Sequence, residues 1–319
     1  MESATCVVDI GLDDFRAAAR RLEGRVRRTP LFDPAPWAPG GAASIRFKLE
    51  NLQVTGSFKA RGAANTVASL TEAERARGLV TASGGNHGLG VACAGQSFGA
   101  PVTIYLPTST PEAKVKKFAR WGATVNVVGQ VWDEANEAAL AHAARDGLTY
   151  VHPFADPRVV AGQGTIALEM LEDAPDLELL VVAIGGGGLI SGVARAARLL
   201  KPSITVIGVE PVGAATLHDS LKAGALVTLD RVATRAGSLA PRRSEQLNLD
   251  IIRENVARIV LVDDAAMERA AAAAWTECGL GLEIAAAASL AALAEGQVPE
   301  ARGARVGVVV CGAGTEGVA

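Results

Sequence analysis

A single lysine in the segment GSFKARGA, residues 56–63, is the first residue whose surroundings could support chemistry. Lys59 follows a Gly-Ser-Phe turn and precedes a run of small residues typical of a tightly packed helix start. A lysine that reacts as an amine needs a partly desolvated site that lowers its pKa. An exposed surface lysine is the alternative, and the remaining motifs decide between the two.

Four consecutive glycines, Gly185–Gly188, lie between an apolar run and a helical pattern in VVAIGGGGLISGVARAARLL. Free backbone N–H groups at a helix start, with no side chains in the way, suit a phosphate. No Gly-Lys-Ser/Thr follows, which excludes a P-loop. The spacing of Gly186, Gly188 and Ser191, with Glu210 at the end of the next apolar run, also approaches a dinucleotide fingerprint. An NAD-binding oxidoreductase is therefore a competing interpretation of this stretch.

A second glycine-rich turn lies in TASGGNHGLGVA, residues 81–92, again between a strand pattern and a helix pattern. N–H groups and polar side chains at such a turn suit a carboxylate, and here they would come from Ser83, Gly84, Asn86 and His87. For His87 alone, a satisfied structural histidine is an equally good interpretation.

Cys311 ends the apolar run VVVCGAG, at the carboxyl end of a predicted strand, where ligands of open α/β sheets bind. Taken alone, a buried structural cysteine is the simpler interpretation. Taken together, the lysine, the strand-end cysteine and the two glycine-rich turns match a cofactor that carries both a phosphate and an aldehyde. We therefore predict that the chain binds pyridoxal 5′-phosphate.

Alternating strand and helix patterns must position these residues. Helical periodicity fills the segments between apolar runs, and TEAE at 71–74 fits a capping box. The alternation predicts an α/β protein with parallel twisted sheets flanked by helices, in blocks at about 65–150 and 177–312. The runs predicted as buried strands are 79–83, 102–106, 123–129, 177–184, 205–210 and 305–312.

The overall composition excludes several classes of protein. The chain has 319 residues, 49% hydrophobic and 20% charged, with net charge −3, so it can form two domains and shows no basic cluster for nucleic acid. The four cysteines form no CxxC pair and no Cys/His cluster, which favours a reducing compartment. The N-terminus lacks a signal-peptide pattern, and the apolar region 271–296 is predicted as two buried helices. We expect a cytoplasmic protein that binds neither nucleic acid nor membranes.

Several segments in combination resemble the serine/threonine dehydratase and serine racemase group of fold-type II pyridoxal-phosphate enzymes. They are KLENLQVTGSFKARGA, SGGNHGLGVA, HPFADPRVVAGQGTIALEM, GGGGLISG, GVEP and VVVCGAG, and the similarity runs from about Arg28 to Gly314. The resemblance implies two α/β domains of the tryptophan synthase β-like fold, with the cofactor in the interdomain cleft. We assign 1–64 and 151–319 to a large cofactor-binding domain, and 65–150 to a small domain that binds the substrate carboxylate.

The same resemblance implies roles for individual residues of this sequence. Lys59 would hold the cofactor as a Schiff base and remove the substrate α-proton, and Phe58 would pack against the cofactor ring. Asn86 would bond the ring hydroxyl, Cys311 would face the pyridine nitrogen, and Glu283 would lie near the ring. The phosphate would bind Gly185, Gly186, Gly187, Gly188 and Leu189. The substrate carboxylate would bind Ser83, Gly84, Asn86 and His87.

The activity implied is β-elimination from a β-hydroxy amino acid, with L-threonine or L-serine converted to a 2-oxo acid and ammonia. Gly84 stands where racemising members carry a second serine, so we predict elimination with little racemisation. Dehydration of 3-hydroxyaspartate or an aryl-serine, β-replacement and racemisation stay open as alternatives on the same cofactor. The NAD interpretation leaves Lys59 unexplained, and a non-catalytic sensor would not need a reactive amine.

Three further expectations concern binding partners and regulation. Glu210 is present where some members bind a divalent cation, but Thr216 stands in place of their aspartate, so we expect no metal. The family favours homodimers. The sequence ends at Ala319, and we expect no regulatory domain after the catalytic one.

Overall fold

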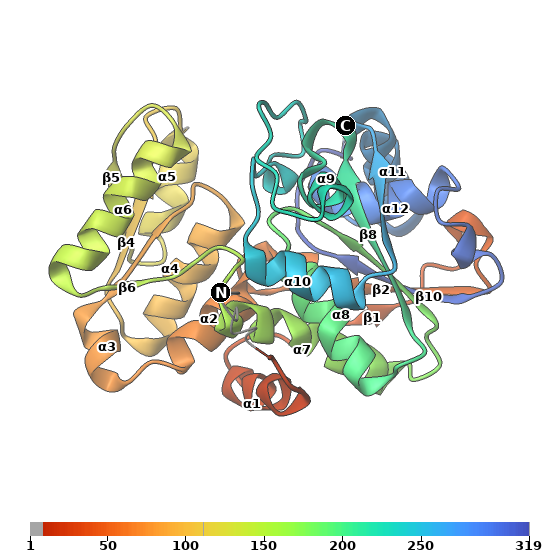
Figure 1. The fold of residues 1–319 in the computed structure, drawn as a ribbon, viewed down its shortest axis with the longest axis horizontal. Helices are drawn as coiled ribbons and strands as arrows, with labels where there is room; N and C mark the ends of the chain where they lie inside the picture. Colours follow the sequence, from red (N-terminus) through yellow and green to blue (C-terminus); the bar gives the residue numbers. More distant parts are fainter. Residues whose placement is uncertain (1–8, 111, 319) are drawn as a thin grey trace, which may run out of the picture.

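The computed structural model describes residues 9–110 and 112–318. Figure 1 shows two lobes side by side, each with its own sheet and its own covering helices. Cys6 lies outside the described residues, and the cysteines within them are free thiols. No helix in the described part of the chain is long and apolar enough to cross a membrane.

The smaller lobe is built on a four-stranded parallel sheet in the order β5-β4-β3-β6. Its strands are β3 (Leu79–Ala82), β4 (Val102–Leu106), β5 (Thr124–Val127) and β6 (Thr149–Tyr150). Its helices are α3 (Glu72–Arg77), α4 (Asn86–Phe98), α5 (Glu112–Ala119) and α6 (Trp132–Asp146). The predicted capping box starts α3, because the Thr71 hydroxyl accepts from the Glu74 N–H and the Glu74 carboxylate accepts from the Thr71 N–H.

The larger lobe is built on a six-stranded sheet in the order β1-β2-β10-β7-β8-β9, parallel except for β1. Its strands are β1 (Leu31–Phe32), β2 (Ser44–Leu49), β7 (Leu179–Ala183), β8 (Thr205–Pro211), β9 (Arg258–Val262) and β10 (Arg305–Val310). Its helices are α1 (Leu12–Leu22), α7 (Pro157–Asp173), α8 (Gly188–Leu200), α9 (Thr216–Ala223), α10 (Gln246–Asn255), α11 (Asp264–Cys278) and α12 (Ala288–Ala294). The α/β class with parallel sheets is confirmed.

All six predicted strands are present, but two predictions of burial are wrong. The run 123–129 contains β5, whose residues are exposed or half-buried because β5 is the edge strand of its sheet. The region 271–296 does form two helical segments, and α12 is buried. The other helix, α11, buries only one face, and its Trp275 is 43% exposed.

One helix, α2 (Lys59–Ala68), packs against helices of both lobes, α4 on one side and α7 on the other. Glycines allow this close approach: a Cβ on Gly90 would lie 3.1 Å from the backbone carbonyl of Lys59, and a Cβ on Gly162 would lie 2.7 Å from that of Arg61. Backbone atoms move aside less readily than side chains, so a Cβ at Gly162 would clash and one at Gly90 would be a tight contact. The start of α2 is thereby fixed against both lobes.

Candidate active site

Lys59 is the first residue of α2, and its amine is held by a backbone carbonyl. Nζ donates a hydrogen bond of 2.6 Å to the carbonyl oxygen of Pro153, in the segment that leads from β6 to α7. Among the described residues, no carboxylate lies within ion-pair distance of this amine. Burial therefore dominates and lowers the pKa of Lys59 to about 8, with Cys311 and Glu283 opposing the shift. Such an amine is partly neutral near physiological pH.

The turn that carries Lys59 is attached to the end of β10. The backbone N–H of Phe58 donates to the carbonyl of Cys311 at 3.1 Å, and Ser57 forms a β-bridge with Gly312. The Phe58 ring lies beside the lysine, with its centroid 5.2 Å from Nζ. Burial raises the pKa of the Cys311 thiol well above its usual range, so the thiol is neutral. Lys59, Phe58 and Cys311, three of the predicted residues, are thus brought together.

The four glycines form the turn between β7 and α8, at the same end of the large sheet. Backbone N–H groups of Gly185–Leu189 have no hydrogen-bond acceptor in the described part of the chain. Gly187 has φ +96°, and a Cβ on Gly188 would lie 2.6 Å from the Phe154 carbonyl oxygen. The loop therefore needs glycine at these positions, and its free N–H groups at the start of a 13-residue helix favour an anion.

The second glycine-rich turn joins β3 to α4 and contacts the large lobe through Asn86. The Asn86 side-chain amide donates to both carboxylate oxygens of Glu283, at 3.0 and 3.2 Å. Burial raises the pKa of Glu283, and the bond from Asn86 partly offsets that rise. This contact links residues 197 positions apart and brings two predicted site residues together.

His87 lies in the same turn, and its ring contacts a backbone carbonyl of the segment after β6. Nε2 lies 3.0 Å from the carbonyl of Val151, and the side chain is buried. Burial lowers the pKa of His87 to about 3, so the ring is neutral and donates its one N–H to that carbonyl. The geometry agrees with the satisfied structural histidine, and only the backbone N–H of His87 is available at the turn.

Glu210, the acid in the NAD interpretation, serves a different purpose. Its carboxylate accepts the backbone N–H groups of Leu217 and His218, at 2.9 and 2.8 Å, and so caps α9. Burial raises the pKa of Glu210 to about 8 despite these bonds. Both oxygens already have partners, which leaves this acid poorly placed to bind a ribose. Within the described residues, no three His, Cys, Asp or Glu side chains gather as a metal site.

Several residues that hold the site were missed in the sequence. Pro153 was not identified although it stands in the HPFADP motif, and its carbonyl positions the amine of Lys59. Phe154, from the same motif, covers the glycine loop. Ser244 and Asn248 both donate to the carbonyl of Gly186. Neither residue belongs to a motif, and the amphipathic pattern of α10 does not distinguish an asparagine that binds the glycine loop.

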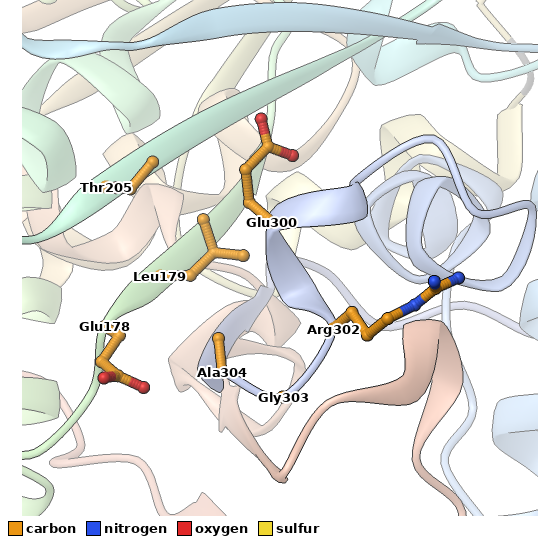
Figure 2. Close-up of a pocket in the computed structure, with 7 residues that line it drawn as sticks. All are labelled: Glu178, Leu179, Thr205, Glu300, Arg302, Gly303 and Ala304. Atoms are coloured by element: carbon orange, nitrogen blue, oxygen red, sulfur yellow. The ribbon is translucent and has the colours of Figure 1, made fainter.

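A surface pocket of about 280 Å³ lies at the other end of the large sheet (Figure 2). Its lining includes Leu179 and Thr205, the first residues of β7 and β8, whereas the glycine loop follows the last residue of β7. Arg302 is drawn pointing away from the hollow, and Glu178 and Glu300 already pair with Arg305 and Arg258. This pocket is separate from the candidate active site.

Comparisons with known proteins agree with this geometry. Residues 22–312 match the family model described as "Pyridoxal-phosphate dependent enzyme". The chain is 44% identical over 255 residues to an L-threonine ammonia-lyase of Thermotoga maritima, covering 80% of this chain and 64% of that protein, less than two thirds of its length. It is 38% identical to a phenylserine dehydratase of Ralstonia pickettii, and the match covers 96% of this chain and 94% of that protein.

A solved structure shows the same fold. The processed form of threonine deaminase isoform 2 from Solanum lycopersicum superposes with a TM-score of 0.90 at 33% identity, covering 95% of this chain and 83% of that one. The family match extends over most of the sequence and includes Lys59, both glycine-rich turns and Cys311. The chain therefore belongs to the family of pyridoxal-phosphate dependent enzymes.

Proposed function

We propose that this chain is an ammonia-lyase that dehydrates a β-hydroxy amino acid, with L-threonine and L-serine as the first candidates. The observation that carries the proposal is the amine of Lys59, which has a lowered pKa and a carbonyl partner instead of a carboxylate. It lies at the start of the helix that contacts both lobes. The similarity to a threonine ammonia-lyase and a phenylserine dehydratase supports the same reaction class.

The residues present fit pyridoxal phosphate. The free N–H groups of Gly185–Leu189 would hold its phosphate, and Phe58 would pack against its ring. Asn86 and Glu283 would lie at the ring hydroxyl side, and the thiol of Cys311 would face the ring nitrogen. The absence of any ion pair at Lys59 within the described residues leaves its amine available to bond the aldehyde.

When bound, pyridoxal phosphate supplies an electron sink for the negative charge left at the substrate Cα. Lys59 is the base that takes the α-proton, because a pKa of about 8 lets the amine exchange protons near physiological pH. The N–H groups of the Ser83–His87 turn, with the Ser83 hydroxyl, would hold the substrate carboxylate. Gly84 has no proton to return to the opposite face of Cα, so the chain's residues favour elimination over racemisation.

We further propose a two-domain organisation with the cofactor between the lobes. The hydrogen bond from Asn86 to Glu283 and the contacts of α2 with both lobes support this arrangement. The core of the small lobe includes Ala63 and Ala64, which supports a boundary within α2, near the proposed one at 64/65. The other boundary, at 150/151, follows β6 directly. A homodimer in the cytoplasm is part of the same proposal, on the family resemblance alone.

The visible absorption spectrum of the purified protein, before and after L-threonine is added, tests the proposal. We expect absorbance from lysine-bound cofactor, a change on adding substrate, and release of 2-oxobutanoate and ammonia. The same assay with L-serine, 3-hydroxyaspartate and phenylserine would show which substrate side chains the enzyme accepts best. A protein that shows no cofactor absorbance even after pyridoxal phosphate is supplied would contradict the proposal.

A further inference from the structure

The carbonyl group of Gly186, inside the glycine loop, is held by two side chains from outside the loop. Asn248 on α10 donates from Nδ2 at 2.8 Å, and Ser244 donates its hydroxyl at 2.9 Å. Both residues are fully buried, so water does not compete for these bonds. The Asn248 amide also donates to the carbonyl of Phe154 at 3.3 Å. One side chain therefore ties together the loop, the segment before α7, and α10.

A carbonyl fixed on one side also fixes the N–H that follows it. In a trans peptide, the C=O of one residue and the N–H of the next point in opposite directions. The two bonds to the Gly186 oxygen therefore aim the N–H of Gly187 away from Ser244 and Asn248. That N–H has no acceptor within the residues described, so it is free to bind an anion.

Without such bonds, little in the sequence would fix the orientation of a peptide between two glycines. Glycine reaches positive and negative φ about equally, and the chain has four glycines in a row here. Gly187 has φ +96°, next to the doubly bonded carbonyl. A loop that is already ordered before the anion arrives binds it more tightly, because binding then loses less conformational entropy.

We propose that Ser244 and Asn248 are positioning residues for the cofactor phosphate. They hold the Gly186–Gly187 peptide in the orientation that presents the Gly187 N–H to the phosphate, and they act through the loop. The inference rests on the proposed function, because it takes the anion to be the phosphate of pyridoxal phosphate. A tie that served only to stabilise the fold would affect cofactors with and without a phosphate equally.

The test measures the affinity of the protein for pyridoxal phosphate and for pyridoxal, which lacks the phosphate. The variants are Asn248→Leu, which keeps the shape but removes both donors, and Ser244→Ala, which removes one hydroxyl. Losing a buried hydrogen bond to the loop should weaken binding of pyridoxal phosphate about tenfold in Asn248→Leu and about threefold in Ser244→Ala. Binding of pyridoxal should change less than about twofold.

Asn255→Leu is the matched control, because Asn255 is also a buried asparagine of α10 and donates to the carbonyl of Ile251, not to the loop. It should leave both affinities unchanged. Equal losses for the two cofactors, or no loss, would overturn the positioning role while the proposed function stands. A wild-type protein that binds pyridoxal phosphate no better than pyridoxal would overturn the phosphate site itself. Ser244→Ala keeps the test decisive if Asn248→Leu fails to fold.

Discussion

The two glycine-rich turns share a pattern, strand, polar turn and helix start, but the protein restrains them very differently. The Gly185–Gly188 turn is covered by Phe154 and bonded by Ser244 and Asn248 at one carbonyl. The Ser83–His87 turn is half-exposed, and a Cβ on Gly85 would meet nothing within 4 Å. Among its side chains, Asn86 reaches the other lobe through its bond to Glu283.

This difference matches two kinds of ligand. A cofactor that stays bound through many turnovers benefits from an ordered cradle, since the ordering cost does not recur at binding. A substrate that enters and a product that leaves in every cycle need a turn that is accessible. Lys59 begins the helix that contacts both lobes, so its amine can reach both the cofactor and the substrate.

Removing the amine should produce the largest effect, because Lys59 is the proposed contact with both the cofactor and the substrate. Lys59→Ala should lower the rate of 2-oxo acid release by at least about 10³-fold, since it removes the proposed covalent anchor and the proposed base together. Product release measured by a coupled dehydrogenase assay checks this. Cofactor should still bind non-covalently in the glycine loop, as equilibrium dialysis would show. A Lys59→Ala enzyme that is still active would contradict the assignment of Lys59 as the cofactor anchor and the base.

Adding a methyl group to each turn should separate their roles. In Gly188→Ala the new Cβ would lie 2.6 Å from the Phe154 carbonyl oxygen, so the affinity for pyridoxal phosphate should fall about a hundredfold. Gly85→Ala has open space and a negative φ, so cofactor affinity should stay within about twofold. Dialysis against pyridoxal phosphate measures both. Equal losses in the two variants would break the contrast between the turns.

The pH dependence of cofactor capture should report the environment of Lys59. The neutral amine attacks the aldehyde, and the pKa of about 8 makes the protonated form dominate below pH 8 and the neutral form above it. The association rate should therefore rise about tenfold between pH 7 and pH 9 and level off above that. Stopped-flow absorbance follows the reaction. A rate that rises about a hundredfold between pH 7 and pH 9 and is still rising at pH 10 would indicate an ordinary exposed lysine.

The smallest change in dehydration rate should come from placing a hydroxyl in the Ser83–His87 turn. A Cβ on Gly84 would lie 3.5 Å from Thr110 Cγ2, an ordinary contact, so Gly84→Ser fits without strain. The new hydroxyl could return a proton to the opposite face of Cα. We expect racemisation of L-serine to become measurable by chiral chromatography while the dehydration rate changes by less than about tenfold. A variant with no gain in racemisation would contradict the role assigned to Gly84.

The sequence was sufficient for the strand–turn–helix units of this site, because each is local. The apolar runs that became β3, β7 and β10 ended within a few residues of their predicted positions, and the turns after them carried the candidate residues. The unpredicted strands, including β2 and β9, pair with neighbours far away in the sequence. Both carried a local strand signal that was not recognised, because β2 (SIRFKL) alternates polar and apolar residues and β9 (RIVLV) is a continuous apolar run.

The contacts between units could not be predicted in this way. The bond from Asn86 to Glu283 joins residues that only the folded sheets bring together. The orientation of the His87 ring depended on the carbonyl of Val151, at the end of a different strand. Asn248 reaches the glycine loop from a helix whose polar residues have no distinguishing spacing.

The most direct test of the central claim is to locate the cofactor on the chain. The protein is loaded with pyridoxal phosphate, reduced with sodium borohydride, digested, and mapped by mass spectrometry. We expect one pyridoxyl group, on Lys59, because its amine has a lowered pKa and no carboxylate partner among the described residues. A label on Lys48, which pairs with Glu169, or a label spread over surface lysines, would contradict the assignment of Lys59 as the cofactor anchor.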